Sequence, residues 1–167
     1  MSTNNKNQYF ESIYNENAQS IVRLCYMYLK DLSLAEDATQ ETFIKAYRKL
    51  NTFNRKSNIN TWLTAIAINT CKNIMRQKSF GKNMSLDEAR EITATPTTDN
   101  DTSITLGTAI RSLPIDLRTV ILLKYYRDLS IKDIAKIVKV PETTVNYRLL
   151  KAKEILKDTL KEDIIYD

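Results

Sequence analysis

The chain has 167 residues, of which 43% are hydrophobic, and a formal net charge of +5. Only two glycines and three prolines are present, which excludes sheets with many tight turns and predicts an all-α fold. Histidine is absent, so the usual general base, the commonest zinc ligand and every Ser-His or Cys-His nucleophile pair are excluded. Carboxylate or lysine chemistry remains possible, but no inward-facing pair of acidic residues indicates it. We therefore expect that the protein is not an enzyme and has no catalytic residue, metal or other cofactor.

The N-terminus, MSTNNKNQYF, lacks the apolar core of a secretory signal. No charge-free apolar run approaches the roughly 20 residues that a helix needs to span a bilayer. The nearest run, Ser57–Cys71, is short and is interrupted by asparagine and threonine. These features predict a cytoplasmic protein.

The first predicted helix covers about residues 9–29, with a break expected near Asn15–Asn17. Its apolar side chains recur at helical spacing and predict a buried face of Ile13, Ile21, Leu24, Cys25, Tyr28 and Leu29. The chain has one other cysteine, Cys71, and the spacing of the two does not suit a metal site. Both are interpreted as small core residues rather than as a disulfide or redox pair.

A second helix is predicted to begin at Ser33, because Ser33-Leu34-Ala35-Glu36 has the capping-box pattern, and to end near residue 50. Its expected inward face consists of Ala35, Ala38, Thr42, Phe43, Ala46, Tyr47 and Leu50. The opposite face consists of Asp37, Gln40, Glu41, Ile44, Lys45 and Arg48. An isoleucine among these polar side chains favours a partner-binding surface over plain solvent exposure.

Residues 51–58 form a polar loop with one aromatic residue, Phe53, and two cations, Arg55 and Lys56. A loop of this composition beside a neutral helix face resembles a site for single-stranded nucleic acid, because an aromatic wall accepts a base and cations hold the backbone. Without further context, an ordinary exposed loop is the favoured interpretation.

A third helix is predicted from about residue 59 to residue 78. Its expected core side chains are Ile59, Trp62, Leu63, Ile66 and Ile74. Its first half, up to Cys71, is uncharged. Asn69 stands there among apolar neighbours, and its amide can bond either a base edge or a nearby carbonyl group.

Residues 83–104, NMSLDEAREITATPTTDNDTSI, are rich in threonine, aspartate and asparagine and poor in large apolar side chains. Such a segment cannot bury enough surface to offset its ordering entropy, so a flexible linker is expected. We predict two small helical domains, residues 1–80 and 106–167, joined by a linker over residues 81–105.

Basic residues are concentrated in these two predicted domains. Residues 1–79 carry 11 basic and 6 acidic groups, and residues 107–157 carry 11 and 5. Residues 80–106 carry 2 basic and 5 acidic groups, and residues 158–167 carry 1 and 4. Clustered lysine and arginine neutralise phosphates, so two basic blocks favour two surfaces that face nucleic acid.

Residues 130–153, SIKDIAKIVKVPETTVNYRLLKAK, have the pattern of a helix, a short turn and a second helix. Ser130 is the expected N-cap, and Lys139-Val140-Pro141 is expected to end the first helix, since the residue before a proline avoids the α region. In the second helix we expect a buried stripe of Val145, Leu149, Ala152 and Leu156. A helix-turn-helix that reads the DNA major groove is predicted, and two helices packed in a plain bundle are the alternative. The side chains off the stripe are Asn146, Tyr147, Leu150 and Lys151.

Three longer segments also follow one another in a characteristic order. They are DATQETFIKAY at Asp37–Tyr47, TWLTAIAINTCKNIMR at Thr61–Arg76 and LPIDLRTVILLKYYRDLSIKDIAKIVKVPETTVNYRLLKAK at Leu113–Lys153. Together they resemble an extracytoplasmic-function (ECF) sigma factor, a small two-domain member of the sigma-70 family of bacterial RNA polymerase subunits. The resemblance covers nearly everything except residues 1–8, the linker and the C-terminal tail. It implies an alternative sigma factor that binds RNA polymerase core and directs promoter-specific transcription initiation.

The resemblance implies roles for individual positions. The first domain corresponds to sigma region 2, and its second helix is implied to bind the polymerase β′ subunit through Asp37, Gln40, Glu41 and Ile44. The following loop is implied to capture a flipped base of the promoter −10 element, with the candidate residues Phe53, Asn54, Arg55, Lys56, Ser57, Asn58 and Asn69. The second domain corresponds to region 4, and its recognition helix is implied to read the −35 element through Thr143, Thr144, Asn146, Tyr147, Arg148, Leu150 and Lys151.

The implied partners are the polymerase core, through its β′ and β subunits, and promoter DNA, with no small-molecule substrate. Sigma factors of this kind are commonly held inactive by an anti-sigma factor, which is often membrane-anchored. The resemblance therefore implies an anti-sigma partner and sequestration at the membrane as well.

Three positions depart from the family pattern. Lys139 stands where many relatives have a turn glycine, Thr143 replaces another glycine, and Tyr147 replaces a common serine. A non-glycine residue in the left-handed conformation costs about 1 kcal/mol. All three positions flank the DNA-facing surface, so the resemblance transfers no promoter preference. A stand-alone helix-turn-helix regulator is the alternative function; such proteins usually dimerise on two half-sites, and no dimerisation stripe is evident here.

Overall fold

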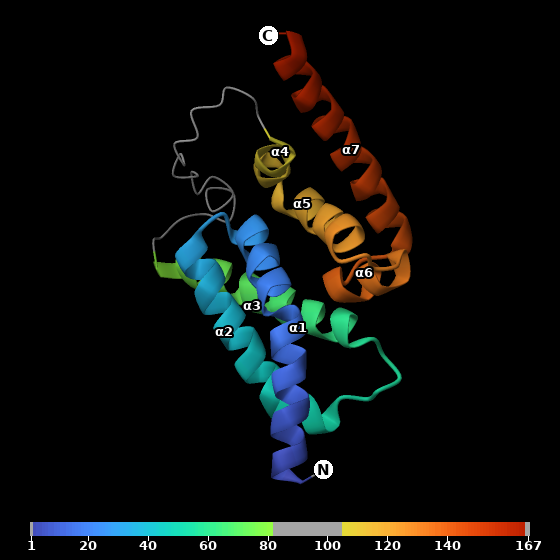
Figure 1. Cartoon of the computed structure of the whole chain (residues 1–167). Helices are drawn as coiled ribbons and strands as arrows, with labels where there is room; N and C mark the ends of the chain where they lie inside the picture. Colours follow the sequence, from blue (N-terminus) through green and yellow to red (C-terminus); the bar gives the residue numbers. More distant parts are fainter. Residues whose placement is uncertain (1, 82–104, 166–167) are drawn as a thin grey trace. The chain divides into compact units, whose positions relative to one another are not determined.

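The computed structural model describes residues 2–81 and 105–165, and that part of the chain is helical and contains no strand. The all-α prediction is thereby confirmed. The chain divides into two compact units, residues 1–80 and residues 81–167. Helices α1 to α3 belong to the first unit and α4 to α7 to the second (Figure 1). The predicted linker falls almost entirely outside the described residues.

The first unit is built on two antiparallel helices, α1 (Thr3–Leu29) and α2 (Leu32–Lys49), which pack along each other. A connection of only two residues forces this arrangement, and Lys30 turns the chain there with a φ of 62°. A single 3₁₀ turn, η1 (Leu50–Thr52), and a loop lead to α3 (Ile59–Gly81), which crosses the pair (Figure 1).

Two expectations about the helices of this unit were wrong. The N-cap of α2 is Asp31 rather than Ser33, and the Asp31 carboxylate accepts the Leu34 N–H at 2.9 Å. A carboxylate caps as well as a hydroxyl does, and its charge also suits the positive end of the helix dipole. Helix α1 has no break, because the Asn17 amide donates to the Ile13 carbonyl at 2.8 Å and so bonds within the helix.

The core of the first unit agrees with the sequence prediction on α1 and differs from it on α3. All six predicted α1 residues are buried. On α3 only Leu63 of the five predicted core residues is buried, and Ile59, Trp62, Ile66 and Ile74 are partly exposed. The buried face of α3 is shifted by about one position instead, because apolar side chains occur on several sides of this helix and periodicity alone does not select one of them. The other buried residues of α3 are Thr64, Ala67, Ile68, Thr70 and Cys71.

The second unit consists of short helices packed beside one long one. They are α4 (Leu106–Ser112), α5 (Ile115–Ile121), a wide π turn η3 (Leu122–Tyr126), α6 (Ile131–Val138) and α7 (Glu142–Ile165). Its core holds fully buried side chains from every part of this sequence, including Leu113, Val120, Leu123, Ile134, Val145 and Ala152.

Helix α6 begins and ends where the sequence predicted. The Ser130 hydroxyl accepts the Asp133 N–H at 3.1 Å and caps α6. Lys139 ends the helix in the left-handed region, with a φ of 59°, and the Val140 N–H donates to the Ala135 carbonyl at 3.2 Å. Lys139 thus occupies the left-handed position at the end of a helix that is usually taken by glycine. The strain of this conformation for a residue other than glycine is about 1 kcal/mol.

Candidate nucleic-acid interface

The outward face of α2 carries the residues expected to bind a protein partner. Asp37, Gln40 and Glu41 are exposed, and Ile44 beside them is 52% exposed. Glu41 forms an ion pair with Lys45 at 2.6 Å, and the Lys45 ammonium also donates to the Thr70 hydroxyl at 3.3 Å. These contacts tether the Glu41 carboxylate to α3, so the face presents an acidic and amide surface around one apolar side chain.

The loop between η1 and α3 is held by two asparagines. The Asn54 side chain accepts the Lys56 N–H at 3.2 Å, and the Asn54 carbonyl accepts the Ser57 N–H at 3.1 Å. The Asn58 side chain accepts the Asn60 N–H at 2.8 Å and thereby caps α3. Of the predicted −10 residues in this loop, Asn54, Ser57 and Asn58 therefore shape the backbone.

The remaining loop side chains form contacts with rings or lie in solvent. Phe53 packs on Trp62, with 4.7 Å between the ring centroids, and the Arg55 guanidinium lies over the Tyr9 ring at 5.4 Å. Lys56 is exposed. The structure thus brings the aromatic residue and one cation of the loop against two other helices.

A recess of about 180 Å³ opens beside these contacts and is lined by Tyr9, Leu50, Asn51, Phe53 and Arg55. Asn69 is exposed on α3 and does not line this recess. Sequence analysis missed Tyr9, Leu50 and Asn51 as site residues. No spacing pattern connects Tyr9 to a loop some forty positions further along the chain, and Leu50 was assigned only to the core of the first unit.

The charged residues of the loop and of α3 are all basic. Between Glu41 and Asp87 the sequence contains no acidic residue, whereas lysines and arginines recur throughout that stretch. An anionic strand could approach the loop and α3 without meeting a carboxylate from either segment.

In the second unit, α7 presents a mixed polar and apolar surface. Tyr147 is 60% exposed and Leu150 is 62% exposed, and Thr143, Asn146 and Lys151 are exposed with them. The predicted buried stripe lies on the opposite side, with Val145, Leu149 and Ala152 buried and Leu156 half-buried. The Lys151 ammonium lies 5.9 Å from the centroid of the Tyr147 ring. Two large apolar side chains on a helix surface are suited to contact base edges such as a thymine methyl.

Two of the seven predicted −35 residues do not belong to this exposed surface. Arg148 is partly buried, and its guanidinium lies 3.9 Å from the carboxylate of Asp116 on α5. Thr144 is half-buried. Arg148 is therefore placed at the edge of the reading surface rather than at its centre.

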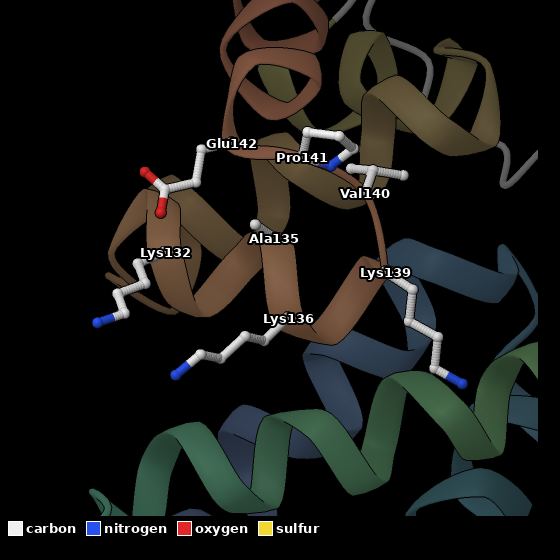
Figure 2. Close-up of a pocket in the computed structure, with 7 residues that line it drawn as sticks. All are labelled: Lys132, Ala135, Lys136, Lys139, Val140, Pro141 and Glu142. Atoms are coloured by element: carbon white, nitrogen blue, oxygen red, sulfur yellow. The ribbon is translucent and has the colours of Figure 1, made fainter.

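A second recess, of about 450 Å³, lies between α6 and the start of α7. Three lysines, Lys132, Lys136 and Lys139, line it together with Glu142 and a floor of Ala135, Val140 and Pro141. Figure 2 shows Lys132 and Lys136 extending to the side of α6 on which Glu142 lies, whereas Lys139 extends away from them. Sequence analysis did not group these lysines, although the spacing of Lys132 and Lys136 by four residues places them on one helix face.

The two cysteines are fully buried and are not joined in a disulfide. The pKa of the Cys71 thiol is raised well above its ordinary value. The main cause is a hydrogen bond with Cys25, and burial is the second cause. A raised pKa suppresses the thiolate, which is the reactive form of cysteine. Within the described residues there is also no group of three histidine, cysteine or acidic side chains able to hold a metal ion. In the same part of the chain, no helix is long and apolar enough to cross a membrane.

Each unit is matched by a different protein-family model. A family model described as Sigma-70 region 2 matches residues 13–80, and one described as Sigma-70, region 4 matches residues 103–156. The first match contains the loop and the outward face of α2, and the second contains the α6–α7 surface.

Several curated proteins are similar over most of the chain. The RNA polymerase sigma-H factor of Pseudomonas aeruginosa is 32% identical over 155 residues, which cover 84% of this chain and 80% of that protein. The ECF RNA polymerase sigma factor SigW of Bacillus subtilis is 30% identical over 167 residues, covering 92% and 89%. The ECF RNA polymerase sigma-E factor of Haemophilus influenzae is 34% identical over 140 residues, covering 75% and 74%.

Solved structures share the fold at lower identity. The sigma factor RpoE of Bartonella quintana, solved with the anti-sigma factor NepR, matches with a TM-score of 0.76 and 23% identity, covering 91% of this chain and 96% of that one. CnrH, solved with the cytosolic domain of CnrY, matches with a TM-score of 0.66 and 16% identity, covering 94% and 90%.

Proposed function

This chain belongs to the ECF group of the sigma-70 family and is an alternative sigma factor that directs transcription initiation, and we propose that it does so through three separate surfaces. Sigma factors as a family are not enzymes. The family assignment also disfavours a stand-alone helix-turn-helix regulator. The observation that best supports the proposal is that each unit carries its own basic, partly apolar surface, one at the loop and one on α7.

The first surface is the α7 face, which reads the −35 element in the major groove. Tyr147, Leu150 and Lys151 supply apolar and cationic contacts to base edges. The lysines of the α6–α7 recess hold the DNA backbone, as the first helix of such motifs commonly does. Arg148 contributes at the edge of this surface, through phosphate contact rather than base contact.

The second surface is the loop with the adjoining face of α3, which captures an unstacked base of the −10 element near Asn69. Capturing a flipped base offsets the unstacking cost of a few kcal/mol and so favours strand opening. Asn54, Ser57 and Asn58 act by shaping the loop, and Phe53, Arg55 and Lys56 face the strand.

The third surface is the outward face of α2, which binds the β′ subunit of RNA polymerase core through Asp37, Gln40, Glu41 and Ile44. The apolar side chain of Ile44 lies within a polar rim, an arrangement typical of protein interfaces. The second unit contacts the β subunit. The protein acts in the cytoplasm.

An anti-sigma factor is the remaining proposed partner, and it holds the protein inactive, at the membrane where it is itself membrane-anchored. RpoE of Bartonella quintana, which has the same fold, was solved in complex with an anti-sigma factor.

Reconstituted transcription tests the proposal. Purified protein added to bacterial core polymerase should initiate from specific sites in a genomic library, and should bind those sites weakly without polymerase. Tight operator binding without polymerase, or no initiation from any template, would refute it. The double variant Gln40→Ala, Glu41→Ala should weaken core binding while the fold is retained, and unchanged affinity would remove the α2 face from the proposal.

A further inference from the structure

Lys45 connects the outward face of α2 to the interior of the first unit. Its ammonium lies 2.6 Å from Oε1 of Glu41, one helical turn earlier, and donates to the Thr70 hydroxyl of α3 at 3.3 Å. Thr70 is fully buried, whereas the Glu41 side chain is 47% exposed and that of Lys45 is 31% exposed. One side chain therefore reaches from the core of the unit to the surface on which a partner is expected.

The bond to Thr70 distinguishes this ion pair from an ordinary one on a helix surface. Ion pairs between residues four apart are common on helices, and an exposed pair by itself fixes neither side chain. A lysine ammonium is a compact charge on a flexible stem of four carbons. Here the hydroxyl of a buried residue on a second helix holds the ammonium, and the ammonium in turn holds the Glu41 carboxylate. The position of Glu41 thus depends on where α3 lies beside α2.

The geometry leaves the contact with a partner to Glu41 rather than to Lys45. The ion pair engages Oε1 of Glu41, so Oε2 can accept a hydrogen bond from the partner. Two of the three donors of the ammonium are already engaged, and the lysine is less exposed than the carboxylate. Glu41 therefore offers the partner a carboxylate whose orientation is set before binding.

We propose that Lys45 is a positioning residue for RNA polymerase binding, which acts by holding Glu41 in the orientation that the polymerase binds. The inference rests on the proposed function of the α2 face and adds to it a residue that need not touch the polymerase. A side chain that is ordered before binding loses less conformational entropy on binding. The gain expected from one such side chain is about 2- to 12-fold in affinity.

A lysine beside Glu41 has a second effect, of opposite sign. It lowers the negative charge of the face and repels a basic partner surface. Lys45→Met removes the charge and keeps an apolar stem, so orientation predicts weaker polymerase binding by this variant and charge screening predicts tighter binding. The bond to Thr70 favours orientation, because screening requires only the ion pair.

A double-mutant cycle tests the inference. The affinity of the full chain for purified bacterial core polymerase is measured for the wild type, Thr70→Val, Glu41→Gln and the double variant. Thr70→Val removes the hydroxyl that accepts from Lys45, retains the β-branched shape and leaves both charges in place. It should weaken core binding by about 2- to 12-fold in the wild type and have little effect in the Glu41→Gln background.

The chain offers a matched control for this substitution. Thr42 is also fully buried, and its hydroxyl donates within α2, to the Ala38 carbonyl at 2.6 Å. Thr42→Val should therefore leave the affinity for core polymerase unchanged. Trp62 fluorescence in denaturant confirms that each variant is folded.

Substitutions of the lysine itself test the same link from its other end. Lys45→Met should weaken core binding as Thr70→Val does, and should lose this effect in the Glu41→Gln background. Lys45→Arg keeps a donor of the same charge and should retain more affinity than Lys45→Met. Because Lys45 is partly exposed, these variants also decide the question if Thr70→Val does not fold.

The outcomes distinguish this inference from the proposed function. If Glu41→Gln weakens core binding and neither Thr70→Val nor Lys45→Met does, the inference is wrong and the proposed function stands. Equal losses from Thr70→Val with and without Glu41 would show that the hydroxyl acts through the fold, and tighter binding by Lys45→Met would show that the lysine screens Glu41. Either result overturns the inference. If Glu41→Gln leaves core binding unchanged, the inference fails and Glu41 also leaves the proposed α2 surface.

Discussion

The two regions proposed to bind DNA position their side chains by different physical means. On α7 a regular helix carries the reading residues, and the buried residues Val145, Leu149 and Ala152 on its other side determine which ones face outward. In the loop before α3, the side chains are positioned by single hydrogen bonds that Asn54 and Asn58 accept and by the ring contact of Phe53 with Trp62. The helical surface therefore depends on a whole domain core, whereas the loop surface depends on a few individual contacts.

Destabilising the core of the second unit alone should leave the first unit folded. Ile134 of α6 is fully buried, so Ile134→Ala should cost about 2–5 kcal/mol of unfolding free energy in the second unit. Trp62 is the single tryptophan and lies in the first unit, so its fluorescence reports that unit, whereas circular dichroism reports both. We expect part of the circular dichroism transition to move to lower denaturant while the Trp62 transition stays in place. A common shift of both signals would show that the units unfold as one.

On α7, two neighbouring cations should contribute differently to promoter reading. Lys151→Ala should weaken −35-dependent transcription, by about 1–3 kcal/mol if the lysine contacts a base. Arg148→Ala should have a smaller effect, because its guanidinium lies beside Asp116 at the edge of the surface. Both are measured with reconstituted holoenzyme on a promoter that requires its −35 element. Equal losses would return Arg148 to the reading surface, and full activity of Lys151→Ala would remove Lys151 from it.

The loop surface should respond to the loss of one hydrogen bond. Asn58→Ala removes the cap of α3 and should lower the unfolding free energy of the first unit by about 1 kcal/mol, measured by Trp62 fluorescence in denaturant. Ser57→Ala is the matched control, because its hydroxyl makes only an exposed bond of 3.3 Å to the Asn54 carbonyl. If the two variants lose the same stability, capping does not hold this loop.

In the turn of the helix-turn-helix, the sign of a change in unfolding free energy shows whether the Lys139 backbone is strained. Lys139→Gly should raise the unfolding free energy of the second unit by up to about 1 kcal/mol, because Lys139 has a φ of 59°. Lys136→Gly makes the same replacement at an exposed position inside α6 and should lower it by about 1 kcal/mol. Circular dichroism in denaturant measures both. A loss of stability in both variants would mean that the left-handed lysine bears no strain.

The success of the sequence predictions followed the range of the interactions involved. The buried face of α1, the Ser130 cap and the end of α6 at Lys139 were predicted correctly, since helical periodicity, capping and the effect of a proline act between residues a few positions apart. The start of α2 was misplaced by two residues, because Asp31 and Ser33 are both competent caps and local pattern does not choose between them. On α3 the largest apolar residues were taken for the core, whereas the packing of the first unit buries a face shifted by about one position, which includes Ala67, Ile68 and Cys71.

The sequence by itself therefore determined an all-helical chain, the helix-turn-helix and, through three ordered motifs, membership of the sigma family. The tertiary structure alone decided that Arg148 lies beside Asp116 and that Tyr9 joins Phe53 and Arg55 around one recess. Each of these arrangements brings together side chains from separate helices and loops. The distances between these side chains depend on how whole helices pack, and no pattern of neighbouring residues in the sequence predicts them.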